Sequence, residues 1–203
     1  MKRLMIFIIF ILPFFKVSAY EIGLSDYGFN YQLLQVDKHT KTEMQVGDFA
    51  HALGLYFTYT PYKYTNYIYK HWQSTIGGDF VYISDESPFS QSVTGKNNSD
   101  VSNKSSKVMG YSVYLETGLS AYVKGFDSLR AGFMLGYKYN NIDRTIFKCS
   151  DCNKQDLNRF SHAIYLKPFI AFNIFNGIYG QLYLSHYFES SGFKHGLGLQ
   201  ITF

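Results

Sequence analysis

The sequence has few prolines, one tryptophan and no long apolar run after its first residues. Four of the 203 residues are Pro and one is Trp, whereas 19 are Tyr and 19 are Phe. Little proline with much tyrosine and phenylalanine favours β-strands over a helical bundle. Beyond residue 19, no apolar run approaches the roughly 20 residues that a membrane-spanning helix needs. If the mature chain crosses a membrane, it therefore crosses with strands.

The chain also has little net charge. Its formal charge is +4, from 19 Lys and Arg against 15 Asp and Glu. Three of the basic residues, Lys2, Arg3 and Lys16, lie within the first 19, which leaves 16 basic and 15 acidic residues and a charge of +1 for the remainder. The composition gives no support to nucleic-acid binding, which needs a basic surface.

The first 19 residues have the pattern of a cleaved secretory signal. Lys2 and Arg3 precede an apolar run at 4–15, and Val17 and Ala19 occupy the −3 and −1 positions of a cut after Ala19. The apolar run is too short to span a bilayer comfortably. We therefore expect a signal peptide at 1–19 and one domain at 20–203, with a retained N-terminal anchor as the alternative.

The last ten residues, 194–203, alternate with a period of two. The apolar residues from Leu197 to Phe203 share one face with His195, and small or polar residues take the other face. A soluble edge strand with such a face invites aggregation, whereas a closed membrane barrel requires apolar residues toward lipid and polar residues inside. The stretch therefore predicts the closing strand of a barrel, ending in an aromatic residue.

Seven further segments repeat this alternation, with turn-forming stretches between them. The clearest is 48–60, where Phe49, His51 and Leu53 begin an outward face and Ala50 and Ala52 an inward one. The total is eight, an even number as closure requires. The strands are expected at 27–36, 48–60, 67–84, 108–123, 129–140, 159–174, 178–188 and 194–203.

The connections alternate between long and short, which predicts an all-β fold, an eight-stranded antiparallel up-and-down transmembrane β-barrel. Such a barrel has short turns on the periplasmic side, with both termini, and longer loops outside. A soluble secreted β-sandwich is the alternative. Pro168, in the middle of a strand, cannot donate to the ladder and predicts a bulge. The long connections are 37–47, 85–107, 141–158 and 189–193, and the short ones are 61–66, 124–128 and 175–177.

The export signal, the eight alternating strands, the loop asymmetry and Phe203 together resemble the small bacterial outer-membrane barrels of the OmpA transmembrane domain, OmpX and Opa type. The resemblance covers the whole mature chain and is one of architecture, without a diagnostic motif of a subfamily. It implies a monomer in the outer membrane of a Gram-negative bacterium, in contact with lipid and lipopolysaccharide. It also implies insertion by the barrel assembly machinery, with Phe203 as the assembly signal. Architecture alone does not fix function.

Five charged residues have inward parity and form a candidate interior charge network. Side chains nearly fill the lumen of an eight-stranded barrel, so buried charges there have to pair. We expect a plugged lumen rather than a narrow channel. The five are Asp79, Glu116, Arg130, Lys138 and Lys167.

Four histidines, His51, His162, His186 and His195, have outward parity near the expected extracellular strand ends. The sixth, seventh and eighth strands are consecutive, and closure puts the eighth beside the first, so three of the four could lie side by side. Metal ligation needs converging ligands, whereas side chains on a lipid-facing rim splay apart. We therefore expect contact with lipid A phosphates here, and neither a metal site nor a cofactor.

The same rim has a faint similarity to the lipid-A 3-O-deacylase family (PagL), which places a catalytic His and Ser on its late strands. His186 followed by Ser190 is similar to the His-x-Ser-Asn motif of that family, and Glu189 is the nearby acid. The chain departs from the motif because Phe188 stands where the Ser is expected, and a nucleophile needs its base within hydrogen-bond reach. The similarity implies His186, Ser190 and Glu189 as candidate catalytic residues.

Cys149 and Cys152 lie close together in the expected loop 141–158. In an exported, oxidising compartment such a pair most simply forms a local disulfide that braces the loop.

The expected function is a structural or surface-interaction role, adhesin-like or porin-like. Loops 37–47, 85–107 and 141–158 are the surfaces for an extracellular ligand. The alternative from another class is a lipid-A-modifying hydrolase at the outer-leaflet rim. A small passive channel is the third interpretation.

Overall fold

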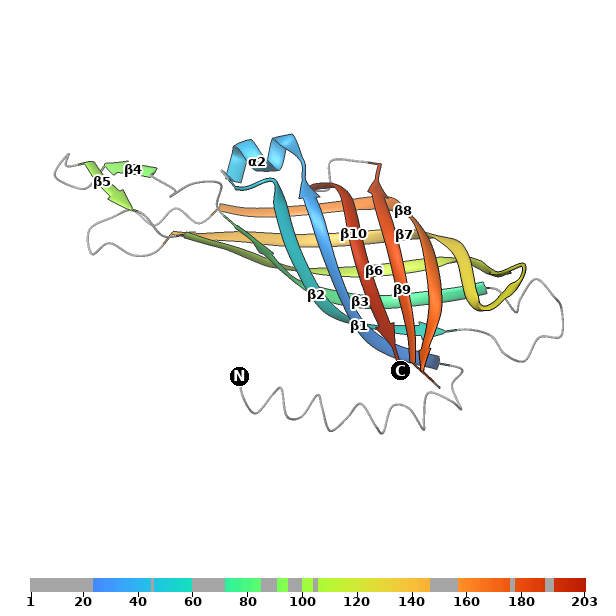
Figure 1. The fold of residues 1–203 in the computed structure, drawn as a ribbon. Coiled ribbons are helices and arrows are strands. Elements are labelled where there is room, and N and C mark those ends of the chain that lie inside the picture. Colours follow the sequence, from blue (N-terminus) through green and yellow to red (C-terminus); the bar gives the residue numbers. More distant parts are fainter. Residues whose placement is uncertain are drawn as a thin grey trace, which may run out of the picture.

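The protein folds as a closed, eight-stranded antiparallel β-barrel (Figure 1). The order around the barrel is β1-β10-β9-β8-β7-β6-β3-β2, and β4 and β5 form a separate two-stranded sheet. The predicted fold class is therefore confirmed. The computed structural model describes residues 24–44, 46–59, 72–84, 91–94, 100–103, 106–146, 157–175, 178–188 and 192–203. The elements are β1 (Leu24–Val36), α2 (Lys38–Met44), β2 (Phe49–Tyr59), β3 (Trp72–Ile83), β4 (Gln91–Thr94), β5 (Asp100–Asn103), β6 (Ser106–Val123), β7 (Phe126–Ile146), β8 (Leu157–Phe175), β9 (Ile178–Tyr187) and β10 (Phe193–Thr202).

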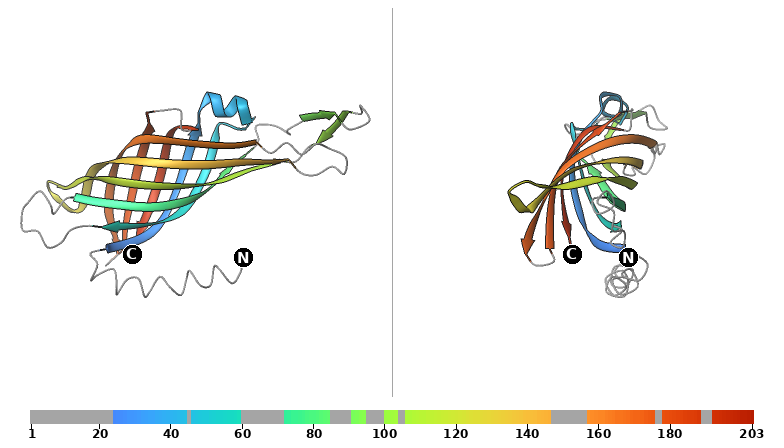
Figure 2. Two further views of the ribbon diagram at one scale, coloured as in Figure 1. Left: turned by 180° about the vertical axis from the view of Figure 1, so that it is seen from behind. Right: turned by 90° about the vertical axis from the view of Figure 1, so that its right-hand side faces the viewer.

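The two ends of the barrel differ. The start of β1 and the end of β10 lie at the end that carries the tight turn between β6 and β7, which we call the turn end (Figure 2). Gly125 makes that turn with φ of 88°, a conformation that favours glycine. The other end, which we call the loop end, carries α2 and the β4-β5 hairpin.

Side chains alternate between the outside and the inside along the strands, as the period of two predicts. In β3, every second residue from Thr75 to Ile83 is buried, and the residues between them are exposed. The alternation is regular because neighbouring side chains of a strand point to opposite faces. The sequence pattern therefore sorts outward from inward residues correctly.

A short helix, α2, occupies the predicted loop 37–47 and covers the loop end. The Asp37 Oδ1 accepts the backbone N–H of Thr40 at 2.7 Å, which caps the first turn. A seven-residue helix is too short to be stable alone, so its packing has to stabilise it. Met44 and Val46 supply that packing, because both side chains are buried.

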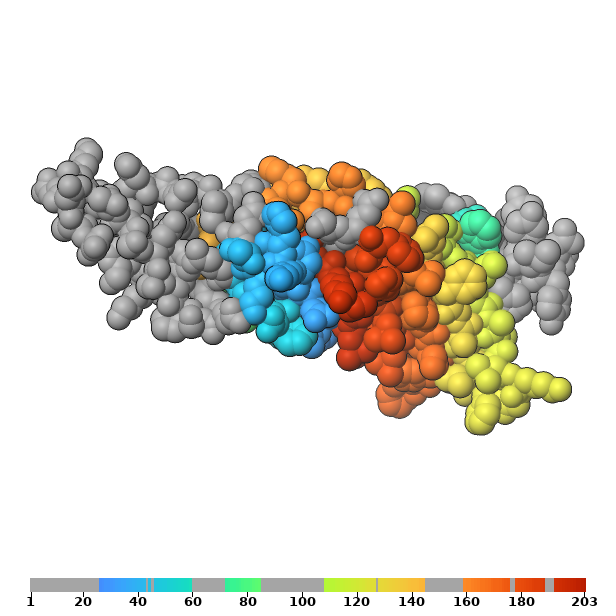
Figure 3. Space-filling view, turned by 90° about the horizontal axis from the view of Figure 1, so that it is seen from above, coloured from blue at the N-terminus to red at the C-terminus, as the bar shows by residue number. Residues whose placement is uncertain are grey.

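The buried residues beneath α2 form an apolar core at the loop end, which we call the loop-end core. The backbone N–H of Asp37 donates to the Gly192 carbonyl at 3.0 Å, and α2 and β10 lie side by side when this end is viewed from above (Figure 3). Arg144 Nη1 donates to the Met44 carbonyl and holds the end of the helix. The loop-end core contains Leu34, Val36, Met44, Val46, Ala50, Ala52, Val81, Ile83, Val108, Ile142, Ala163, Tyr165, Tyr187 and Phe193.

Three predictions about the strands need correction. Strand β7 continues to Ile146, six residues beyond the predicted end, and segment 85–107 contains the paired strands β4 and β5. The structure has no bulge at Pro168, because the β8-β9 register is the same at Leu166↔His186 and Phe169↔Tyr183. The pairs between these two are missing, so the ladder is interrupted without a shift. Proline removes a donor but leaves the register unchanged.

Aromatic rings inside the barrel lie over glycines of the adjacent strand. Gly77 pairs with Tyr114, and Gly136 pairs with Tyr165. A Cβ atom at either glycine would lie 2.3 Å from the ring of its partner. Glycine is therefore required where a large ring lies flat against the inner wall of the barrel.

The C-terminal residue Phe203 connects the last strand to the first. Its backbone N–H donates to the Tyr27 carbonyl at 2.9 Å, and its ring meets the ring of Phe29 edge to face at 5.9 Å. These contacts place Phe203 at the seam of closure, and its role as an assembly signal stays a prediction. In the part of the chain that the structure describes, no helix is long and apolar enough to cross a membrane. The predicted signal at 1–19 lies outside the described residues.

Candidate functional site

Two ion pairs occupy the middle of the barrel interior and form the first candidate site. Lys138 Nζ lies 2.9 Å from Asp79 Oδ2, and Lys167 Nζ lies 2.6 Å from Glu116 Oε2. All four side chains are almost completely buried. The strands β3, β6, β7 and β8 position them, so the structure brings together four of the five predicted interior charges. Two acids and two bases leave this layer without net charge, as burial in a narrow lumen requires.

Neutral polar groups complete the coordination of each carboxylate. Asp79 also accepts hydrogen bonds from Asn30 Nδ2 at 2.8 Å and from the Ser112 hydroxyl at 3.3 Å. Glu116 Oε1 accepts the Tyr165 hydroxyl at 2.5 Å. A buried ion pair is tolerated only when further hydrogen bonds satisfy its remaining lone pairs, and both carboxylates meet this condition.

Amide side chains join the two pairs to the strands around the seam. Lys138 Nζ donates to Gln32 Oε1 at 3.3 Å, and Lys167 Nζ donates to Gln200 Oε1 at 3.2 Å. The Tyr183 hydroxyl donates to Asn30 Oδ1 at 2.6 Å. These hydrogen bonds form two groups, one around each ion pair, and Lys167 Nζ of one group lies 4.4 Å from the centre of the Tyr183 ring of the other. We call the two groups together the ionic layer: Asn30, Gln32, Asp79, Ser112, Glu116, Lys138, Tyr165, Lys167, Tyr183 and Gln200.

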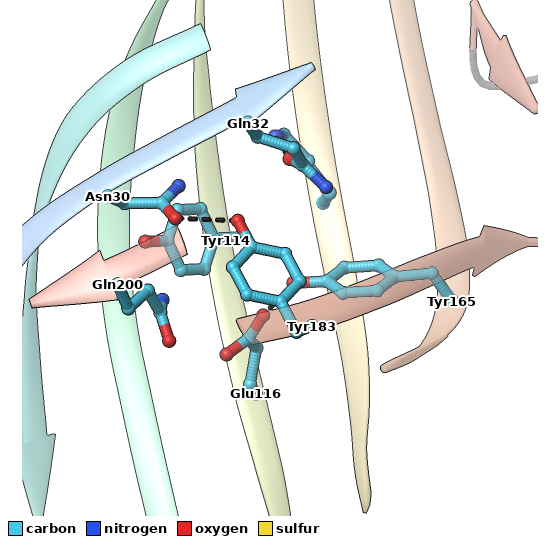
Figure 4. A pocket seen from close by; sticks show the side chains of 8 residues that line it. Asn30, Gln32, Tyr114, Glu116, Tyr165, Tyr183 and Gln200 are labelled. Carbon is cyan, nitrogen blue, oxygen red and sulfur yellow. Dashed lines mark hydrogen bonds between the residues drawn. The ribbon is translucent and has the colours of Figure 1, made fainter. Parts of the chain in front are cut away.

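A cavity of about 10 Å³ remains within the ionic layer (Figure 4). Figure 4 shows the tyrosine rings and amide groups of the ionic layer pointing toward one another across it. This volume holds about one water molecule. The lumen therefore has no room here for a substrate, and its charges neutralise one another instead of presenting an acid or a base to a ligand.

Arg130, the fifth predicted interior charge, lies apart from the ionic layer near the turn end. Its guanidinium carbon is 6.0 Å from the centre of the Tyr122 ring and 5.6 Å from that of Tyr179. The side chain is half-buried, and the two rings offer it cation–π contact. Parity alone placed it inside, but its height along the barrel separates it from the four paired charges.

Two groups of interior residues were missed at the sequence level. Arg144 is fully buried in the extension of β7, and continuing the alternation past Asn140 would have found it. Asn30 and Gln32 have the inward parity of β1, but polar amides without charge gave no chemical reason to select them.

The outward histidines form the second candidate site, and the structure brings two of the four together. His186 and His195 are register partners on β9 and β10, and their Nδ1 atoms lie 3.1 Å apart. The His51 Nδ1 hydrogen-bonds the Tyr31 hydroxyl at 2.8 Å instead, and His162 stacks on Tyr137.

His186 is the only one of the three candidate catalytic residues that the structure describes; Ser190 and Glu189 lie outside the described residues. The Phe188 ring meets the His186 ring edge to face at 5.3 Å. Among the described residues, His186 therefore has ring contacts with Phe188 and His195. Cys149 and Cys152 also lie outside the described residues, and their disulfide stays a prediction.

Comparison with known proteins gives similarity to solved barrels only. A scan against protein-family models and a search of curated proteins both found no match. The N-terminal β-barrel domain of Pseudomonas aeruginosa OprF is similar with a TM-score of 0.46 and 10% identity, over 89% of this chain and 99% of that one. Ail, the attachment invasion locus protein of Yersinia pestis, solved with the heparin analogue sucrose octasulfate, has a TM-score of 0.44 and 9% identity, over 87% of this chain and 92% of that one. The strand pairing described above therefore establishes the fold.

Proposed function

We propose that the protein is an outer-membrane β-barrel that anchors itself in the bilayer and presents its loop end for interaction outside the cell. The observation that carries this proposal is that apolar side chains cover the outside of the barrel and charged side chains lie inside it, the reverse of a soluble protein. Leu53, Leu115 and Leu184, on three different strands, are each 58–60% exposed on the outer wall, while the charges of the ionic layer are buried. Soluble proteins rarely leave so large an apolar surface in water, whereas a barrel in lipid requires it.

Aromatic residues at both ends of the outer wall support the same location. Tyr59, Trp72 and Phe175 are exposed at the turn end, and Phe49 and Phe160 are exposed toward the loop end. Aromatic side chains gather in this way where a membrane barrel passes from the acyl chains to the head groups. The apolar side chains between them then face the acyl chains.

A sealed lumen favours an interaction role over a passive channel. The ionic layer fills the middle of the barrel, and the loop-end core with α2 covers one end. An eight-stranded barrel is just wide enough for side chains to fill it. Ions would have to displace both layers to pass.

The orientation can be tested with two epitope insertions of equal length. One replaces part of the segment between β4 and β5, and the other is placed at Gly125 in the turn between β6 and β7. On intact cells, antibody should label the first insertion only, and both should be labelled once the outer membrane is opened. Labelling of the Gly125 insertion on intact cells would reverse the orientation, and absence of both from the outer-membrane fraction would refute the location.

The interaction role and the hydrolase alternative predict different results for lipid A composition and for cell attachment in one set of cells. The set carries the wild-type protein, a His186→Ala variant, or a variant whose β4-β5 hairpin is replaced by a short Gly-Ser linker. An interaction protein gives unchanged lipid A in all cells, and attachment to host cells or matrix is lost only with the hairpin. Loss of an acyl chain from lipid A, seen by mass spectrometry with the wild type and absent with His186→Ala, would establish the hydrolase instead.

A further inference from the structure

The paired histidines of β9 and β10 have a geometry that the interior layers do not explain. His186 and His195 are both exposed on the outer wall. Their Nδ1 atoms are joined by a hydrogen bond of 3.1 Å, which a shared metal ion would replace, whereas their ring centres are 4.8 Å apart. The rings therefore approach each other at the two nitrogen atoms and diverge behind them. The expectation that rim side chains splay apart does not hold for this pair.

This arrangement matches the requirements of two ligands on one metal ion. Metal–nitrogen bonds of about 2.0–2.1 Å at angles between square-planar and tetrahedral place two donor nitrogens about 2.9–3.4 Å apart. The observed 3.1 Å falls inside this range. We propose that His186 and His195 form a bidentate site for a late first-row divalent metal ion at the outer rim of the barrel.

The backbone fixes the pair in place. The two residues lie directly opposite each other in the antiparallel ladder of β9 and β10. Cross-strand partners have Cβ atoms about 4.5–5.5 Å apart, so two imidazoles there reach a common ion without backbone movement. The Phe188 ring also packs edge to face against the His186 imidazole at 5.3 Å.

The donor set selects the class of ion. Imidazole nitrogen suits copper, nickel and zinc, and the affinity for a given site follows the order in which Cu²⁺ exceeds Ni²⁺ and Zn²⁺. No group of three or more His, Cys, Asp or Glu side chains comes together among the described residues. The described residues therefore supply two ligands, and water or the phosphates of head groups can complete the coordination of the ion. Such a site binds reversibly and is not a closed structural metal centre.

The test is Cu²⁺ binding to the untagged protein folded in detergent micelles, measured by calorimetry. Cys149→Ser and Cys152→Ser are introduced throughout, because thiolates compete for the same ions. His186→Ala and His195→Ala are compared with His162→Ala, a matched control on the same outer wall that stacks on Tyr137. Each protein is first checked for the heat-dependent gel mobility of a folded barrel, and all three positions are exposed, so folding should be retained.

Cu²⁺ should bind with one-to-one stoichiometry. His186→Ala and His195→Ala, the two rim variants, should each weaken the Cu²⁺ affinity by at least about tenfold, because loss of even an outer-shell partner of a metal lowers affinity by about 10-fold to 100-fold. His162→Ala should leave binding unchanged. Electron paramagnetic resonance should show coupling to two imidazole nitrogens in the parent and to one in each rim variant. Absence of binding, or equal weakening by His162→Ala, would overturn the proposal, and so would a two-nitrogen spectrum that survives loss of His186.

Discussion

The loop-end core and the ionic layer are neighbours inside one barrel and share Tyr165, yet they are stable for opposite reasons. The loop-end core removes apolar side chains from water, as the core of a soluble domain does. The ionic layer removes four charges from water, which costs free energy that pairing has to offset. The loop-end core tolerates small changes in which apolar side chains touch, whereas the ionic layer requires every charge to keep its ion-pair or hydrogen-bond partner. The alternating sequence pattern is the same in both, so an inward position does not determine which kind of packing it joins.

The largest effect should come from breaking one pair of the ionic layer. Lys167→Met leaves Glu116 buried without its cation and should lower the free energy of unfolding by about 3–5 kcal/mol. Urea unfolding in lipid vesicles, followed by fluorescence, measures the loss.

Two controls separate burial from charge. The double variant Glu116→Gln with Lys167→Met should be far milder than the single one, because neither charge is left alone. Lys41→Met breaks a pair of the same kind with Asp48, at 2.9 Å but with both side chains partly exposed, and should cost about 1 kcal/mol or less. An equal loss in both lysine variants would remove the distinction between the layers.

In the loop-end core, a truncation should cost less than a broken ion pair. Met44, the last residue of α2, points into the loop-end core and is fully buried. Met44→Ala should lower the free energy of unfolding by about 2 kcal/mol, the low end for buried methionine, because the short helix that carries residue 44 can shift into part of the cavity. Met44→Leu keeps the volume and should stay under about 1.5 kcal/mol. Equal destabilisation by Leu and Ala would mean that the thioether itself, and not its volume, matters at this position.

Two adjacent glycines of β3, Gly77 and Gly78, allow a test of how tightly aromatic rings pack against the inner face of the barrel. A Cβ at Gly77 would lie 2.3 Å from the Tyr114 ring, whereas one at Gly78 would meet nothing closer than the Ser112 carbonyl oxygen at 3.4 Å. Gly77→Ala should therefore destabilise the barrel by about 1–3 kcal/mol through overpacking. Gly78→Ala should change stability by about 0.5 kcal/mol or less. Thermal unfolding of the two variants side by side decides this, and equal midpoints would contradict the ring-on-glycine packing.

The barrel follows from the sequence because a period of two is a strong and repeated pattern. Parity alone places Asp79, Glu116, Lys138 and Lys167 on the inner face of the barrel. It did not pair them, because Lys138 of β7 reaches Asp79 of β3 across the lumen, past β6 that lies between them. Pairing of this kind depends on strand register and height along the barrel, which no single strand encodes.

Features that depend on tertiary contacts could not be predicted from the alternation of residues along the sequence. The helix α2 is seven residues long and polar, so it has too few turns to show a helical period. The contact between His186 and His195 depends on the β9-β10 register, which outward parity alone does not give. In both cases the sequence shows which residues are present, but it does not show which residues of other strands they contact.

The smallest effect should come from the cap of α2, the element that closes the loop-end core. Asp37→Ala removes the acceptor of the Thr40 N–H and should destabilise the helix by about 1 kcal/mol. Asp37→Asn keeps an acceptor at the same place and should be nearly neutral. Hydrogen exchange of the α2 amides, compared with those of β9, should show faster exchange in α2 alone, because the ionic layer does not depend on the helix. Faster exchange in β9 as well would mean that the two layers unfold together, and the barrel interior would then be one cooperative unit instead of two.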